Sequence, residues 1–263
     1  MIKKVSPDNQ AHPSVEANMA SPAYKLAALD ADFLLGDSMR GARFLLEYQK
    51  AEEHLRAWGV RSTLVVFGSA RFRPDGPERH ANWYNAARKF GELAAKHGGS
   101  LFTEGKMRDN VIATGGGPGI MEAANRGAHD VGAPSVGFNI TLPFEQEPNA
   151  YSTPDLTFNF HYFNMRKLHL AMRANGLAVF PGGFGTMDEL FELLTLRQTL
   201  KIDQPVPIVL YDEEFWKSFL NMETLIEAGT ISPDDLNLFS YANSPEEAWE
   251  TLVARGVLDI CEK

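Results

Sequence analysis

Glycine-rich turns that follow short apolar runs constrain the fold of this chain more than any other feature. The clearest is Pro181-Gly182-Gly183-Phe184-Gly185-Thr186, which lies between an apolar run at residues 177–180 and a helical pattern at 187–200. This order predicts a strand, a turn and a helix. The backbone amides of such a turn, together with the amino end of the following helix, form a site for an anion.

The same alternation runs through most of the chain. We predict strands over residues 63–67, 110–114, 135–140, 157–160, 177–180 and 206–211, and helices over 78–97, 120–129, 164–175, 187–200 and 245–254. Repeated strand–helix alternation predicts an α/β fold, a Rossmann-like doubly wound parallel sheet flanked by helices. Ligands of such sheets bind at the carboxyl ends of the strands, where the glycine-rich turns lie.

The start of the chain has a different character. Residues 1–22 are polar and show no periodicity, so we expect them to be disordered or loosely attached. Residues 37–58 have the apolar spacing of an amphipathic helix, which could pack on its own domain or on a second subunit. We therefore predict a flexible N-terminus with a helical extension over 1–59 and a single globular domain over 60–263.

Charge and cysteine content exclude several classes of function. The formal net charge of −9 argues against nonspecific binding to nucleic acids and to anionic membranes, and an anionic substrate would need local donors. The single cysteine, Cys261, excludes an intramolecular disulfide and fits a reducing compartment. Neither a secretory signal nor a run of about 20 apolar residues is visible. We expect a cytoplasmic protein without a nucleic-acid or membrane partner.

A second glycine-rich segment joins the strand ending at Thr114 to the next helix. It reads Gly115-Gly116-Gly117-Pro118-Gly119, and its backbone can approach a ligand closely because no Cβ intervenes. A tight turn without a ligand is the alternative. The spacing does not match the G-x-G-x-x-G fingerprint, and the GK[ST] ending of a P-loop is absent, so we expect no nucleotide cofactor of those types.

Charged residues near these turns allow two interpretations each. Thr186 and Glu189 have the spacing of a capping box, so Glu189 is either a helix cap or a carboxylate beside the anion site. Arg166-Lys167, at the start of a predicted helix, is either a solvated basic pair or an anion-binding pair. The histidines have no metal-ligand spacing, and no Ser-His-Asp order stands out, so we expect neither a metal site nor a catalytic triad.

These motifs together resemble those of the LOG ("Lonely guy") family, which comprises cytokinin riboside 5′-monophosphate phosphoribohydrolases and related bacterial nucleosidases. PGGFGTMDE is similar to its PGGxGTxxE signature, Arg166-Lys167 to its RK pair, and GGGPGIMEAANRGA to its first glycine-rich motif. Gly68-Ser69 resembles its nucleotide-contacting turn. Proteins with this signature are often labelled lysine decarboxylases, but we find no convincing Schiff-base lysine for pyridoxal-phosphate chemistry.

The resemblance implies that residues 60–263 form a nucleotide-binding catalytic domain. The implied reaction is hydrolysis of the N-glycosidic bond of a nucleoside 5′-monophosphate to a free base and ribose 5-phosphate, without a cofactor, in a homodimer or higher oligomer. Arg166 and Glu189 would be the catalytic pair. The implied substrate and phosphate contacts are Gly68, Ser69, Gly116, Gly117, Gly119, Met121, Lys167, Gly182, Gly183, Gly185 and Thr186.

The chain departs from the plant-like members of the family at three places, and at one of them it carries Phe163-Asn164-Met165 before the RK pair, where those members carry a different triplet ending in Glu. It carries about 60 residues before the first strand and extra residues over 98–109, where Glu104-Gly105-Lys106 is typical of a loop. These departures leave the base open between adenine and an N6-substituted adenine, as in a cytokinin nucleotide. The alternative function is that of a non-catalytic carrier of a phosphorylated ligand such as molybdenum cofactor.

Overall fold

The chain separates into two compact units, Met1–Glu47 and Tyr48–Lys263. The computed structural model describes residues 13–101, 107–143, 147–202 and 205–259. The loop expected over 104–106 therefore lies outside the described residues. The division predicted after residue 59 stays a prediction.

The first unit is helical from the point where its description begins. It contains α1 (Pro13–Ala20), α2 (Ala31–Leu35) and the start of α3 (Arg40–Ala57). Of the two alternatives expected for residues 1–22, α1 is helical rather than disordered, loose attachment stays a prediction, and residues 1–12 lie outside the described part. Proline suits the first turn of α1, and the Asp30 carboxylate accepts a hydrogen bond from Phe33 N at the start of α2. No side chain described between residues 14 and 47 is buried.

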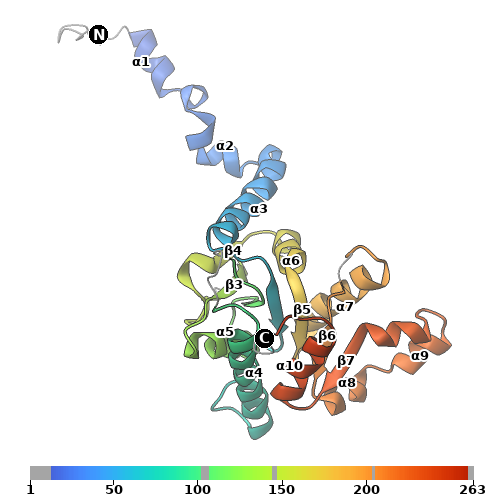
Figure 1. Cartoon of the computed structure of the whole chain (residues 1–263). Helices are drawn as coiled ribbons and strands as arrows, with labels where there is room; N and C mark the ends of the chain where they lie inside the picture. The colour runs from blue at the N-terminus through green and yellow to red at the C-terminus, as the bar shows by residue number, and fades with distance from the viewer. Residues whose placement is uncertain (1–12, 102–106, 144–146, 203–204, 260–263) are drawn as a thin grey trace. The chain divides into compact units, whose positions relative to one another are not determined.

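The second unit is built on a parallel seven-stranded sheet (Figure 1). Its spatial order is β4-β3-β2-β1-β5-β6-β7. The strands are β1 (Thr63–Phe67), β2 (Val111–Thr114), β3 (Ser135–Ile140), β4 (Thr157–Phe160), β5 (Ala174–Val179), β6 (Ile208–Tyr211) and β7 (Phe239–Ala242). Every neighbouring pair is parallel, which confirms the α/β doubly wound prediction.

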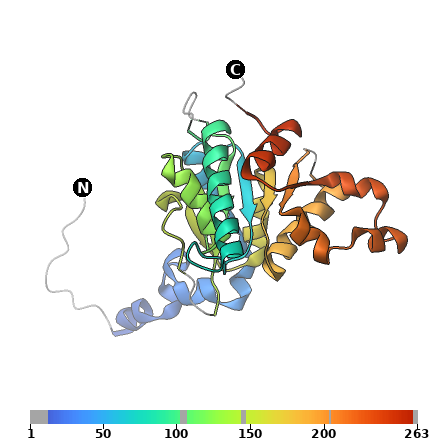
Figure 2. The same cartoon turned by 90° about the horizontal axis from the view of Figure 1, so that it is seen from below.

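Helices cover both faces of this sheet (Figure 2). One core cluster includes residues of α4 (Glu78–His97), α5 (Ile120–Asp130) and α10 (Pro245–Ala254). The other includes residues of α6 (Phe163–Met172), α7 (Phe184–Gln198), α8 (Glu213–Phe219) and the later part of α3. Leu64 and Val66 of β1 point into the first core, and Val65 and Phe67 into the second. A strand buried on both faces reads as an uninterrupted apolar run, which is how the sequence revealed it.

Several predicted boundaries and one missing strand need correction. The strand predicted over 177–180 begins earlier, at Ala174, and the strand predicted over 206–211 begins at Ile208. The helix predicted to residue 175 ends at Met172, because Thr63 N donates to the carbonyl of Arg173 (2.7 Å) and pairing with β1 takes over from there. The helix predicted from residue 187 begins three residues earlier, at Phe184. The edge strand β7 was not predicted.

A buried ion pair ties α3 to the segment between α6 and β5. The guanidinium of Arg173 donates to both carboxylate oxygens of Glu52, at 2.8 and 2.9 Å, and Arg56 donates to the same carboxylate at 2.6 Å. The hydrogen bond from Arg173 lowers the pKa of Glu52 despite its burial. His169 is fully buried near this pair and stacks on Tyr48, so its role is in packing.

The strand order indicates where sheets of this kind bind their ligands. From β1 the chain adds β2, β3 and β4 on one side and then crosses to β5 on the other side of β1. Such a reversal opens a crevice at the carboxyl ends of the two central strands, here β1 and β5. Of the helices described, none is both long and apolar enough to cross a membrane.

Candidate functional site

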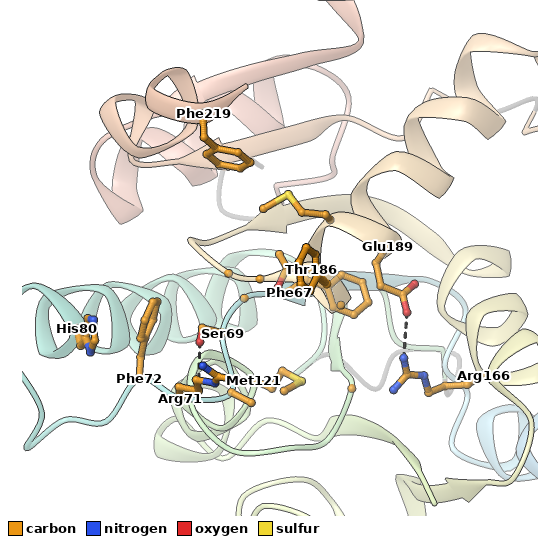
Figure 3. Close-up of a pocket in the computed structure, with 18 residues that line it drawn as sticks. Phe67, Ser69, Arg71, Phe72, His80, Met121, Arg166, Thr186, Glu189 and Phe219 are labelled. Carbon is orange, nitrogen blue, oxygen red and sulfur yellow. Dashed lines mark hydrogen bonds and ion pairs between the residues drawn. The ribbon is translucent and has the colours of Figure 1, made fainter. Parts of the chain in front are cut away.

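A pocket of about 740 Å³ lies at the carboxyl ends of β1, β2 and β5. The turn after β1 (residues 68–72), the turn after β5 and the first turns of α7 form its walls, and Gly115, Met121, Arg166 and Phe219 also line it (Figure 3). This is the crevice expected from the strand order, and it contains the PGGxGT segment.

Ser69 joins the two central turns of the pocket. Its amide donates to the carbonyl of Pro181 (3.0 Å), and its carbonyl accepts from the first amide of α5, at Ile120 (3.0 Å). Gly68 must lack a side chain, because a Cβ there would lie 2.6 Å from Ile120. The turn after β1 is therefore held against both glycine-rich segments.

The glycines of the second turn have different roles. A Cβ on Gly182 would lie 2.1 Å from Thr186 Oγ1 and 3.0 Å from Ser69 N, so close packing requires glycine there. Gly183 and Gly185 have nothing within 4 Å of such a Cβ and face open space. They border the amino end of α7, where the first amides lack helical partners and the helix dipole favours an anion.

The capping-box interpretation of Thr186 and Glu189 is wrong. The helix α7 begins at Phe184 with Gly183 as its cap residue, and no side chain caps it. Thr186 lies inside the first turn, and its amide donates to the carbonyl of Gly183 (3.0 Å). Glu189 is therefore available for another interaction.

Glu189 pairs with Arg166 in the wall of the pocket (Figure 3). Arg166 Nη2, from α6, lies 3.1 Å from Glu189 Oε1, from α7, and the two side chains are 13% and 5% exposed. Burial raises the pKa of Glu189 to about 7, although the positive charge of Arg166 opposes this change. Arg166 Nε is also buried and has no hydrogen-bond partner among the described residues.

This pair has the properties of a catalytic acid or base. A carboxyl group whose pKa lies near neutral pH can gain and lose a proton under physiological conditions, and a position in a pocket gives it access to a substrate. The guanidinium keeps part of the carboxylate population ionised. Among the described residues, no three His, Cys, Asp or Glu side chains are arranged to hold a metal ion.

The structure brings most of the predicted site residues together. The pocket is lined by Arg166, Glu189, Gly68, Ser69, Met121, Gly182, Gly183, Gly185 and Thr186.

Four predicted residues are not part of this lining. The carbonyls of Gly116 and Gly117 accept hydrogen bonds from Asn149 Nδ2, both at 3.1 Å. Gly119 adopts a positive φ of 72° and lies against the carbonyl of Ser69. These contacts are those of a tight turn that supports Ser69 and α5.

Lys167, the fourth, points to other partners. Its Nζ lies 2.8 Å from Asp188 and 3.2 Å from Glu192 on the outer surface of α7. Burial by itself lowers the pKa of Lys167, but the hydrogen bonds to these carboxylates outweigh it and leave the pKa raised. Lys167 therefore stays a cation and holds α6 to α7.

Sequence reasoning missed several residues of the pocket. Arg71 and Phe72 follow the Gly68-Ser69 turn closely, and their position after β1 was the available signal. Phe184, in the glycine-rich turn, is 96% exposed at the pocket. Phe219 comes from α8, which no sequence motif connects to the site.

Comparison with known proteins identifies relatives. A family described as "Possible lysine decarboxylase" matches residues 121–252, half of the chain. The chain is 24% identical over 54% of its length to the probable cytokinin riboside 5′-monophosphate phosphoribohydrolase LOGL2 of Oryza sativa subsp. japonica. It is 26% identical over 52% of its length to the cytokinin riboside 5′-monophosphate phosphoribohydrolase LOG3 of Arabidopsis thaliana. The alignments span 58% and 64% of those relatives' own lengths.

The fold is shared with a solved structure, and a second solved structure gives a lower TM-score. The X-ray structure of TM1055 has a TM-score of 0.51 and 19% identity, over 73% of this chain and 99% of its own. A molybdenum cofactor binding protein of Rippkaea orientalis has a TM-score of 0.49 and 21% identity, over 74% of this chain and 97% of its own. The match to half of the chain, together with these curated relatives, places the chain in the LOG family, whose sequence model carries the description "Possible lysine decarboxylase".

Proposed function

We propose that this protein hydrolyses the N-glycosidic bond of a nucleoside 5′-monophosphate, AMP or an N6-substituted AMP. The products are a free base and ribose 5-phosphate. The observation that carries the proposal is the buried Arg166–Glu189 pair beside the open amino end of α7. The carboxylate of the pair suits a ribose at which a bond is broken, and the amino end of α7 suits a phosphate.

The reaction needs a negative charge near the ribose. Breaking the C1′–N bond leaves the electron pair on the base and builds positive charge on the sugar ring, as in glycoside hydrolysis. An ionised Glu189 would stabilise that charge and accept a proton from the water that attacks C1′. The proton that Glu189 takes from the water then passes to the nitrogen of the departing base, which regenerates the carboxylate and leaves a neutral base and ribose 5-phosphate. Arg166 keeps Glu189 oriented and ionised.

The phosphate fits the turn after β5. Gly183 and Gly185 leave the amino end of α7 uncovered, and Ser69 Oγ and Thr186 Oγ1 belong to residues that line the same wall. An anion gains from the unpaired amides and from the helix dipole. The curated relatives act on cytokinin riboside 5′-monophosphates, which supports a nucleotide substrate without deciding the base.

Lysine decarboxylation has no support in these residues. Pyridoxal-phosphate chemistry needs a lysine that forms a Schiff base. The lysine adjacent to the pocket, Lys167, is engaged by two carboxylates and has a raised pKa, which disfavours the neutral amine that such a reaction requires.

The test is an assay of free base and ribose 5-phosphate released from AMP and isopentenyl-AMP. Glu189→Ala should lower turnover by about a hundredfold or more. Glu192→Ala is the matched control, because Glu192 lies on the same helix but pairs with Lys167 outside this pocket. Turnover in the wild type should rise with pH through about 7, as Glu189 loses its proton.

Two outcomes would contradict the proposal. Full turnover in Glu189→Ala would remove the carboxylate from the mechanism. No release from any nucleoside monophosphate, combined with a stoichiometric phosphorylated ligand in native mass spectrometry, would favour a carrier. A homodimer or higher oligomer and a cytoplasmic location remain proposals from the sequence, and light scattering against the 29.2 kDa chain mass tests the first.

A further inference from the structure

The pocket contains few charged side chains. Arg71, Arg166 and Glu189 line it, and His80 is the other titratable side chain there. Arg166 is occupied by its ion pair with Glu189. A phosphate dianion that enters a protein with a net charge of −9 needs a cation that is not already neutralised.

Arg71 meets that requirement. Its guanidinium forms no ion pair with any carboxylate in the described part of the chain, unlike Arg166 and Lys167. An exposed arginine is commonly only solvated, but this one lines the pocket. Arg73, two residues later in the same loop, is exposed and does not line it. Arg73 is therefore a matched control for the role of Arg71.

The backbone of Arg71 is anchored to the phosphate turn. Its amide donates to Ser69 Oγ at 3.1 Å. Because that oxygen accepts this bond, the Ser69 hydroxyl proton remains available for a ligand. The amide of Ser69 in turn donates to the carbonyl of Pro181. These hydrogen bonds hold the backbone of Arg71 in a fixed position beside the turn after β5.

The arrangement of the labelled residues fits a substrate that spans the pocket. In Figure 3, Arg71 lies toward one side and the Arg166–Glu189 pair toward the other, with Thr186 between them. A phosphate at the amino end of α7 would then have the ribose directed to Glu189 and its outer oxygens directed to Arg71. Guanidinium groups bind phosphate oxygens in bidentate fashion.

We infer that Arg71 is a specificity-determining residue that binds the 5′-phosphate and selects a nucleoside monophosphate over the nucleoside. The inference rests on the proposed function for the identity of the substrate. It adds a residue outside the glycine-rich and RK motifs, and it assigns the charge recognition to Arg71 rather than to Lys167.

The experiment measures binding and turnover for the full-length wild type, Arg71→Ala, Arg71→Lys and Arg73→Ala. Calorimetry with AMP, ribose 5-phosphate and adenosine gives the three affinities. Arg71→Ala should weaken AMP and ribose 5-phosphate about ten- to hundredfold, the range for a lost charge-assisted hydrogen bond. Adenosine affinity should not change. The KM for AMP should rise with kcat almost unaltered, and Arg71→Lys should recover part of the loss.

The outcomes separate this inference from the proposed function. AMP affinity unchanged in Arg71→Ala, an equal loss for adenosine, or the same loss in Arg73→Ala would overturn the role of Arg71. A wild type that binds AMP through Arg71 but releases no base would end the hydrolase proposal and keep this one. A wild type that binds neither AMP nor ribose 5-phosphate would overturn both. Unchanged circular dichroism of the variants excludes misfolding as the cause.

Discussion

Replacing Glu189 with glutamine should change how stability depends on pH. The Glu189 side chain is 5% exposed, and burial raises its pKa from 4.5 to about 7. Between these two values the folded protein keeps a proton that the unfolded chain has already released. The free energy of unfolding therefore falls as pH rises through this range, and the loss is complete above about 7. Glutamine is similar in shape and does not titrate, so it removes this contribution.

The magnitude follows from the two pKa values. At about 1.4 kcal/mol for each pH unit, the full range corresponds to about 3.5 kcal/mol. Most of it lies between pH 5 and pH 8, where we expect a change of about 2 to 3 kcal/mol. The wild type should lose this much more stability than Glu189→Gln over that interval. The ionised carboxylate of Glu189 therefore lowers the free energy of unfolding, as expected for a residue of a functional site.

Denaturant unfolding at pH 5 and pH 8 measures this difference. The free energy of unfolding of each protein is measured at both pH values. The difference between wild type and Glu189→Gln is then compared between the two pH values, which cancels the titration of all other groups. Equal pH dependence in the two proteins would refute the raised pKa. A wild type that gains stability relative to the variant toward pH 8 would show that Arg166 outweighs burial.

The remaining predictions concern packing and the buried ion pair. Gly182→Ala should destabilise the protein by about 1 to 3 kcal/mol and reduce turnover, because its Cβ would lie 2.1 Å from Thr186 Oγ1. Gly185→Ala should leave the thermal midpoint of unfolding nearly unchanged, because a Cβ on Gly185 would meet nothing within 4 Å. An equal loss of stability in the two variants would contradict the packing argument. Glu52→Ala should destabilise by about 3 kcal/mol in denaturant unfolding, since it leaves the Arg173 guanidinium, 13% exposed, without its carboxylate partner. A loss below about 1 kcal/mol would place this pair among weak surface ion pairs.

The central strands could be predicted from the sequence because their signals are local. Residues 63–67 and 135–140 are short apolar runs between turn residues, and the structure has strands with the same bounds. The helix over 78–97 was equally clear from its own residues. Boundaries failed where a distant contact decided them. The end of α6 depends on pairing between Thr63 and Arg173, and neither residue signals it alone.

The candidate site was accessible only in part for the same reason. The glycine-rich turns and the RK pair are contiguous motifs, so their positions could be read directly. Whether Thr186 and Glu189 form a helix cap depends on the residue at which α7 begins. The helix begins at Phe184, directly after the turn in which Gly182 packs against Ser69, and the local sequence does not show that contact. Arg71 and Phe219 line the same pocket only because the turn after β1 and α8 meet there in the folded chain.

The sequence by itself determined the alternating strands and helices, the glycine-rich turns at the strand ends, and an acidic chain that requires local cations for an anionic ligand. These properties depend on neighbouring residues and on composition. The tertiary structure decided that Glu189 is buried against Arg166 and that Lys167 turns away from the pocket. Burial and charge pairing join residues from different elements. The pKa of Glu189, and with it the proposed chemistry, therefore belongs to the folded protein.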